Sequence, residues 1–284
     1  MKLGKDNPIF KDLKDRFKKN TNYILVDDLN SLEIAISFKY DIDTFIYCDD
    51  IEYHTSTKFI IDKALSLSKE YYTISKRMFE TFLSKDNSIG FLAFIKPRIL
   101  SLNDFKDYDF LVVCDRLEIP GNIGTLLRTM DSCKAEGMIL VDPVSKILNP
   151  KMSQLSRGAN LIIPTIEASY SDTLEYLSSN GYDIYLGEPK LGLDYQSYNY
   201  KGKIAIVIGN ERFGINPDWY NHNHKKVYIP MEGHNNSLNV AVAGSILIYE
   251  AYMQRKKWFF DWRITIFLLL ICNLIGHINK FCRV

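Results

Sequence analysis

The chain has 284 residues, a length that suits one large domain or two small ones with a sizeable hydrophobic core. Hydrophobic residues make up 46% of the chain and charged residues 24%, as in ordinary globular proteins. The formal net charge is only +1, so the overall charge does not indicate nucleic-acid binding. The charge is unevenly distributed, however, because residues 1–20 hold seven lysines and arginines and only three aspartates. This basic segment is either a phosphate-contacting end or a solvated, partly frayed helix.

The five cysteines form no CxxC pair, and their irregular spacing predicts neither a zinc site nor a disulfide framework. We therefore expect no metal and a reducing, cytoplasmic setting. The charged start lacks the apolar segment of a signal peptide. Near the end, residues 264–275 are strongly apolar, but a spanning helix needs about 20 such residues. A buried or dimer-packed tail, or a non-native extension, is therefore preferred to a membrane anchor.

Strand-like and helix-like runs alternate over residues 1–98. The strand candidates are short apolar runs, and in two of the stretches between neighbouring strands the apolar residues have helical spacing. This alternation predicts a small α/β domain, followed by a linker that begins near Pro97 and includes 101–109. The predicted strands are 22–26, 44–47, 71–74 and 90–95, and the predicted helices are 31–38 and 57–67.

A second α/β series occupies residues 109–257. Its strand candidates are continuously apolar, which is typical of a parallel sheet covered on both faces. In such a sheet a ligand binds beyond the carboxyl ends of the strands, so we expect a site in the loops that follow them. The predicted strands are 110–114, 137–142, 161–166, 182–187, 204–209 and 226–230, and the predicted helices are 123–133, 151–157, 172–179 and 238–255.

The loop DRLEIPGNIGTLLRT (115–129) follows the first of these strands. Pro120 and Gly121 predict a turn, Asn122 is placed to cap a helix, and Arg128 lies inside that helix. The simple interpretation is a helix N-cap followed by a surface arginine. The functional interpretation makes both residues part of a site.

The segment GNERFG (209–214) follows the strand candidate IAIVI. Its two glycines permit a tight turn and a close approach of backbone to a ligand. It is too short and wrongly ordered for a P-loop, and it is not GxGxxG, so a nucleotide-dependent oxidoreductase is disfavoured. An ordinary turn with a solvated Glu211 is the alternative.

The segment IPMEGHNNSLNVAVAGSILIYE (229–250) runs from a polar loop into a helix rich in small residues. Ser237 and Asn239 open that helix, whose valine, alanine and glycine residues allow close packing on other backbone. An N-cap by Ser237 explains one polar residue but not the whole polar loop.

Together the three loops resemble, in order and spacing, the three motifs of the SpoU/TrmH family of RNA 2′-O-ribose methyltransferases. The resemblance is strong over about 110–256. It is weaker over 7–36, which is similar to the substrate-binding domain often found before the catalytic domain; there Asp27 and Asp28 stand where the family usually has a Glu-Gly pair. The resemblance implies an RNA-binding α/β domain over 1–98, a parallel-sheet α/β catalytic domain with a C-terminal trefoil knot over 109–257, and an apolar tail over 258–284.

The resemblance also implies S-adenosylmethionine (AdoMet) as the cofactor, held in a bent form by the knotted loops. Apolar and glycine positions suit an adenine slot with backbone hydrogen bonds. The positions that carry over to the cofactor pocket are Gly187, Ile208, Gly209, Asn210, Ile229, Met231 and Leu238.

On the substrate side, the resemblance implies a ribose 2′-hydroxyl that must lie in line with the methyl group and lose its proton as it attacks. The sulfonium is already a good leaving group, so no metal is required. Because a guanidinium with a pKa above about 12 is a poor base, we expect the arginine, near the mouth of the cofactor site, mainly to position phosphate and ribose. Glu211 should orient this arginine or the loop. Ser237 and Asn239 should fix the third loop and the substrate. The polar set is Asn122, Arg128, Glu211, Ser237 and Asn239.

The family resemblance finally implies a homodimer through the knotted domain, aided by the helix 238–255, and an RNA partner, with rRNA preferred to tRNA. Four alternatives stay open. They are a non-catalytic RNA-binding protein of the same fold, a ribosome-assembly protein of the same fold, a tRNA-directed methyltransferase, and an enzyme that methylates a base nitrogen. AdoMet binding would separate the enzymes from the non-catalytic proteins.

Overall fold

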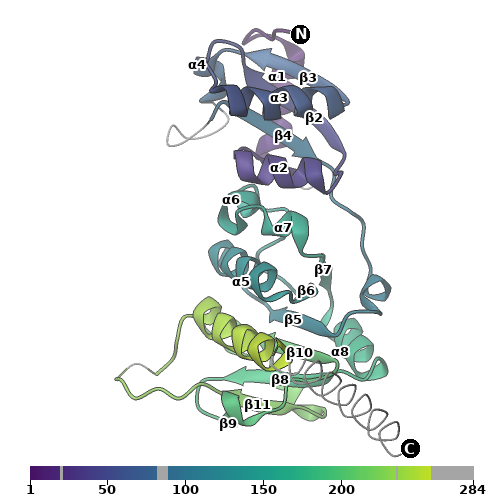
Figure 1. Ribbon diagram of the computed structural model, residues 1–284, viewed down its shortest axis with the longest axis vertical. Helices are drawn as coiled ribbons and strands as arrows, with labels where there is room; N and C mark the ends of the chain where they lie inside the picture. Colours follow the sequence, from purple (N-terminus) through teal and green to yellow (C-terminus); the bar gives the residue numbers. More distant parts are fainter. Residues whose placement is uncertain (20–21, 82–88, 235, 257–284) are drawn as a thin grey trace, which may run out of the picture.

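The computed structural model describes residues 1–19, 22–81, 89–234 and 236–256. These residues form two α/β units, each built on its own sheet, which the segment after β4 connects (Figure 1). Among the described residues, no helix is both long and apolar enough to cross a membrane. The apolar tail predicted over 258–284 lies outside the described residues.

The N-terminal unit is a four-stranded mixed sheet with strand order β1-β4-β2-β3. Strand β2 runs parallel to β3, whereas β4 runs antiparallel to both β1 and β2. The basic segment at the start is a helix that buries Phe10 and Leu13. All four strands predicted here are present. The elements are α1 (Pro8–Lys18), β1 (Ile24–Val26), α2 (Leu29–Ser37), β2 (Ile42–Cys48), α3 (Thr55–Leu67), β3 (Glu70–Ile74), α4 (Lys76–Phe79) and β4 (Phe91–Ile95).

The larger unit is a seven-stranded sheet with strand order β7-β6-β5-β10-β8-β11-β9, and every pairing in it is parallel, as predicted. A long helix over 240–256 closes the described chain. The other elements are η1 (Leu102–Phe105), β5 (Phe110–Asp115), α5 (Pro120–Cys133), β6 (Gly137–Val141), α6 (Met152–Ser156), α7 (Ala159–Ile162), β7 (Thr165–Ala168), α8 (Tyr170–Ser179), β8 (Asp183–Glu188), β9 (Leu193–Asp194), η2 (Tyr195–Ser197), β10 (Ile204–Ile208), η3 (Pro217–Asn221) and β11 (Lys225–Tyr228).

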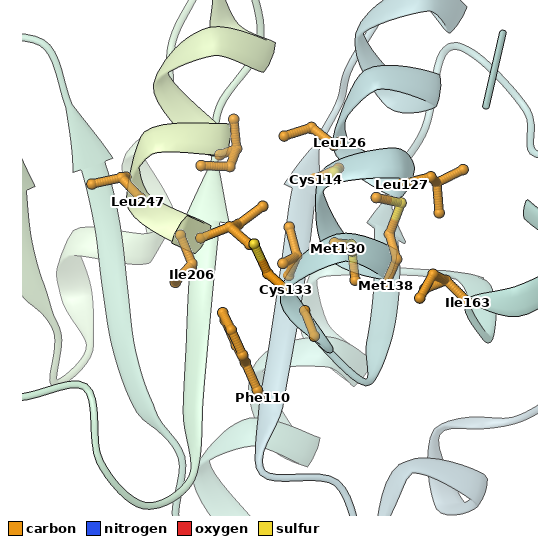
Figure 2. Packing of buried hydrophobic residues seen from close by; sticks show 14 of the residues in the cluster. Phe110, Cys114, Leu126, Leu127, Met130, Cys133, Met138, Ile163, Ile206 and Leu247 are labelled. Atoms are coloured by element: carbon orange, nitrogen blue, oxygen red, sulfur yellow. The ribbon is translucent and has the colours of Figure 1, made fainter. Parts of the chain in front are cut away.

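Both faces of this sheet are buried, which explains why its strands are continuously apolar. Phe110 and Cys114 of β5 belong to a core shared with α5 and the helix 240–256, as Figure 2 shows, whereas Val113 belongs to the core on the opposite face. The helix 240–256 packs very closely on α5. A Cβ added at Gly244 would lie 2.6 Å from Leu126 Cδ2, so only glycine fits there without movement.

One predicted strand is wrong. The sequence predicts a strand over 161–166, but the structure has the end of helix α7 there, and β7 begins only at Thr165. Buried Leu161 and Ile163 make the run continuously apolar, and periodicity cannot separate a buried helix from a buried strand in so short a run. Sheet pairing starts at Pro164, whose carbonyl accepts a hydrogen bond of 2.9 Å from Met138 N.

The two units contact each other where α2 meets α6 and α7. Asn30 Nδ2 donates to the Arg157 carbonyl at 2.8 Å, and Gln154 Nε2 donates to Asp27 Oδ2 at 2.6 Å. Burial, together with the charge of the neighbouring Asp28, raises the pKa of Asp27 to about 6. The Asp-Asp pair that departs from the family pattern therefore lies at the contact between the units, where Asp28 also caps α2 by accepting from Ser31 N.

Candidate functional site

A cavity of about 470 Å³ lies at the carboxyl ends of β8, β10 and β11. Its walls come from the segment after β8, the turn after β10, and the loop that leads from β11 into the helix 240–256. The size of this cavity, and its mainly apolar lining with a few polar groups, are typical of small-molecule sites. All seven positions predicted for the cofactor line this cavity: Gly187, Ile208, Gly209, Asn210, Ile229, Met231 and Leu238.

The turn after β10 is held rigidly. Asn210 and Gly214 exchange two backbone hydrogen bonds of 2.9 and 3.0 Å, and the Asn210 side chain accepts from Arg212 N and donates to the Arg116 carbonyl. A Cβ at Gly209 would lie 2.4 Å from the backbone of Gly214, so this position needs glycine. The side chain of Asn210 therefore stabilises the wall of the cavity.

Glu211 is half-buried and joins the second loop to the first. Its carboxylate accepts from Glu118 N and Ile119 N, both at 3.1 Å, and from Asn122 Nδ2 at 2.8 Å. Partial burial raises the pKa of Glu211, but these hydrogen bonds outweigh burial and hold the pKa below its ordinary value. The alternative of a solvated glutamate in an ordinary turn is wrong.

Asn122 does not cap helix α5, contrary to the simple interpretation. The N-cap is Ile119, which offers no side-chain hydrogen bond, and Glu211 from another loop accepts from its N–H instead. Asn122 lies within the first turn of α5 and is buried. Its amide donates to Glu211, and its carbonyl oxygen accepts from Asn239 Nδ2 at 3.3 Å. The chain Glu211–Asn122–Asn239 thus connects the three sequence motifs at one point.

Asn239, not Ser237, caps the helix 240–256. Its Oδ1 accepts from Ala241 N at 2.9 Å and from Val242 N at 3.2 Å. A cap must accept from the second or third helical N–H, and Ser237 lies too early in the sequence for these bonds. Ser237 is exposed and lines the cavity, so its hydroxyl is available to a ligand.

Arg128 is the one predicted polar residue that does not join the others. It is exposed and lines a different hollow of about 720 Å³ between α5 and the helix 240–256. Within this one chain, the structure brings Asn122, Glu211, Ser237 and Asn239 together, whereas Arg128 lines the separate hollow.

Sequence reasoning missed several residues that line the cavity, among them Glu188 and Leu247. Glu188 ends β8 and accepts a hydrogen bond from the Tyr220 hydroxyl, and burial raises its pKa. Its place at the carboxyl end of a strand was the available signal. Among the described residues, no cluster of three or more histidine, cysteine, aspartate or glutamate residues could hold a metal ion.

Comparison with known proteins matches residues 109–249 to the model of the SpoU rRNA Methylase family. A putative TrmH family tRNA/rRNA methyltransferase of Staphylococcus saprophyticus is 34% identical over 194 residues, which are 61% of this chain and 74% of that protein. A 23S rRNA guanosine 2′-O-methyltransferase of Bacillus subtilis is 29% identical over 139 residues, 49% of this chain. The chain spans 56% of the length of the Bacillus protein and 64% of a related Staphylococcus haemolyticus protein.

The fold is also similar to that of solved structures. An AdoMet-bound rRNA methyltransferase from Sinorhizobium meliloti superposes with a TM-score of 0.79 at 23% identity, and the match covers 88% of this chain and 97% of that one. AviRb, a SpoU methyltransferase from Streptomyces viridochromogenes, superposes with a TM-score of 0.76 at 21% identity, covering 88% and 98% of the two chains. At these identities the matches establish the architecture alone.

Proposed function

Because the chain belongs to the SpoU rRNA methylase family, we propose that it transfers a methyl group from AdoMet to the 2′-hydroxyl of a ribose in structured RNA. The observation that carries the proposal is the chain Glu211–Asn122–Asn239, which joins the three motif loops at the cavity. Residues this far apart in the sequence converge on one hydrogen-bonded network, as the parts of a reaction site must.

The cavity fits the proposed cofactor. Ile208, Ile229 and Leu247 supply apolar walls for an adenine ring, and the glycines at 187 and 209 leave backbone groups accessible to it. When bound, AdoMet supplies an electrophilic methyl group on a sulfonium. The protein's own contribution is the cavity itself, which the rigid Asn210–Gly214 turn holds in shape before any ligand binds.

The polar residues then act on the substrate. Ser237 lies exposed at the cavity and can accept a hydrogen bond from a ribose hydroxyl or donate one to it. Asn122 and Asn239 fix each other's orientation at 3.3 Å, and Glu211 holds Asn122 from the other side. We assign Glu211 a positioning role, because its carboxylate already accepts from three protein donors, and these bonds hold its pKa below the ordinary value.

The position of Arg128 supports a homodimer. The hollow that it lines also contains Val242 and Tyr249, which are 47% and 53% exposed. A second copy of the chain packed over α5 and the helix 240–256 would bury these side chains. It would also carry Arg128 toward the cavity of the partner, where a guanidinium can grip phosphate and ribose oxygens together. We propose that Arg128 positions RNA in this way.

The N-terminal unit is the proposed source of RNA affinity, because it adds a basic α1 to a catalytic unit that holds all three motifs. We place rRNA ahead of tRNA, since the Bacillus subtilis relative that is 29% identical over 139 residues is a 23S rRNA methyltransferase. We further propose the family's trefoil knot in the loops after β10 and β11. The three described cysteines are free and buried, which fits a cytoplasmic location.

Calorimetry with AdoMet and transfer of labelled methyl from AdoMet to RNA test the proposal together. RNA from cells that lack the gene serves as substrate. We expect AdoMet binding and transfer by the full chain, and loss of both in Leu238→Arg, which places a charge in the apolar wall of the cavity. A folded wild-type chain without AdoMet affinity would favour a non-catalytic RNA-binding protein of the same fold.

A further inference from the structure

A third hollow, of about 580 Å³, lies beside the cofactor cavity at the carboxyl ends of β5, β6 and β7. We call it the side hollow and define it by Glu118, Pro120, Val144, Ser145, Lys146 and Asn149. Three consecutive residues separate the two spaces. Ile119 lines the cofactor cavity, whereas Glu118 and Pro120 on either side of it line the side hollow.

The side hollow holds a buried hydroxyl without a partner. Ser145 is only 6% exposed, and its Oγ makes no hydrogen bond to any described residue. Its backbone is fixed, since Ser145 N donates to the Leu117 carbonyl at 3.1 Å. A buried hydroxyl without a partner is unfavourable by about 1–3 kcal/mol, so a polar group that enters the side hollow and bonds this oxygen would be stabilising.

The other walls suit a flat ring with polar edges. Glu118 Oε1 accepts from Asn210 Nδ2 at 3.2 Å, which ties this carboxylate to the turn of the cofactor cavity. At the rim, the apolar side chain of Val144 is 64% exposed. Lys146 is paired with Glu167 at 2.9 Å, so the positive charge at the rim is already balanced. The side hollow thus offers the negatively charged acceptor of Glu118, a hydroxyl and apolar surface, and no unbalanced positive charge.

This inference rests on the proposed function. A ribose that presents its 2′-hydroxyl to the cofactor cavity carries a base on the same sugar, and that base must occupy a neighbouring space. The hollow beside Arg128 is the proposed contact with a second copy, whereas the side hollow shares a three-residue wall with the cavity. Enzymes and RNA-binding proteins commonly read a base that is splayed out of its stack through polar contacts to its edges.

We propose that the side hollow binds the base of the nucleotide whose ribose is methylated. The Glu118 carboxylate accepts from N–H groups on the base edge, the Ser145 hydroxyl bonds a second edge atom, and Val144 contacts the ring face. The three residues would make the side hollow a determinant of which nucleotide is modified, separate from the residues that hold the cofactor.

Two variants of the full chain test the base-binding proposal. For each we would measure AdoMet affinity by calorimetry, the melting temperature, and single-turnover methyl transfer to RNA from cells lacking the gene. Ser145→Leu places a larger apolar side chain in the wall of the side hollow, and Val144→Glu adds a carboxylate to those of Glu118 and Glu167. Both should transfer methyl about a hundredfold more slowly, the scale expected when a reacting group is displaced by about 1 Å. Their AdoMet affinity should stay within about twofold of wild type, because neither residue lines the cofactor cavity.

The matched control is Ile99→Glu, which also replaces a β-branched apolar residue with glutamate, at a linker position that is 99% exposed. This variant should transfer methyl at the wild-type rate. If Ser145→Leu does not fold, Val144→Glu decides, since an exposed rim position tolerates the change. Folded variants that transfer methyl within about twofold of wild type would overturn the base-binding proposal. A wild-type chain that neither binds AdoMet nor transfers methyl would instead overturn the proposed function on which it rests.

Discussion

Glu211 holds the first two motif loops together, so its removal should lower both stability and activity. Glu211→Ala deletes the acceptor of three hydrogen bonds, two of them from the backbone N–H groups of Glu118 and Ile119, just before α5. Each bond contributes about 1 kcal/mol net; the half-exposed setting lowers this contribution and the negative charge of the acceptor raises it. The free energy of unfolding should therefore fall by about 2–3 kcal/mol. At about 3 °C for each kcal/mol in a chain of this size, the melting temperature should fall by roughly 6–9 °C. Methyl transfer should fall further, because Asn122 loses the partner that orients it.

The pH dependence gives an independent check. The folded pKa of Glu211 is below its ordinary value of 4.5, so the unfolded chain takes up the proton first as the pH falls. The stability that Glu211 contributes is therefore full at neutral pH and is lost as the pH falls from 4.5 through the lower folded pKa.

Melting curves from neutral pH to below pH 4.5 should thus show the gap between wild type and Glu211→Gln narrowing at the acid end. Glu175→Gln, at an exposed position of α8, should match wild type throughout. A Glu211→Ala chain that melts and transfers methyl like wild type would refute this role for the carboxylate.

Three further outcomes are expected. Arg128→Ala should leave AdoMet affinity intact and lower methyl transfer to RNA by about two orders of magnitude, and Arg128→Lys should restore little of it. Near-normal transfer by Arg128→Ala would show that Arg128 is a surface arginine without a role in the reaction. Gly209→Ala should weaken AdoMet binding in calorimetry by about tenfold, because its Cβ would lie 2.4 Å from the backbone of Gly214; unchanged affinity would show that the turn adjusts. Burial raises the pKa of Asp27 to about 6, so the stability linked to its proton is complete below 3.8 and is lost as the pH rises through 6. Asp27→Asn should therefore stabilise the chain in urea unfolding more at about pH 8 than at about pH 5, and an equal effect at both would count against the buried carboxylate.

The sequence predicted the architecture well where one signal dominates. Continuous apolar runs identified β5, β6, β8 and β10, because a parallel sheet with both faces covered leaves no polar alternation. The same signal failed at 161–166, where a buried helix turn and a strand have the same composition. The two-residue β9 carries too little pattern to be found.

The site shows a similar division. Motif resemblance gave the seven cavity positions, which backbone geometry and apolar packing place together. It could not show that Glu211 accepts from the N–H of Ile119, the N-cap residue of α5 that lies 92 residues away in sequence, or that Asn239 rather than Ser237 caps the last helix. Such contacts depend on the three-dimensional path of the loops. The separate hollow that Arg128 lines between α5 and the last helix was likewise not predictable from any local pattern.

The most direct test of the central claim is the chemical identity of the methylated product. The purified full chain is incubated with labelled AdoMet and RNA from cells lacking the gene, the RNA is digested to nucleosides, and the label is located by chromatography and mass spectrometry. The network of Asn122, Glu211 and Asn239 beside the cavity predicts label in a 2′-O-methylnucleoside, with none after Asn239→Ala. Label on a base nitrogen, or no label from a chain that binds AdoMet, would contradict ribose methylation.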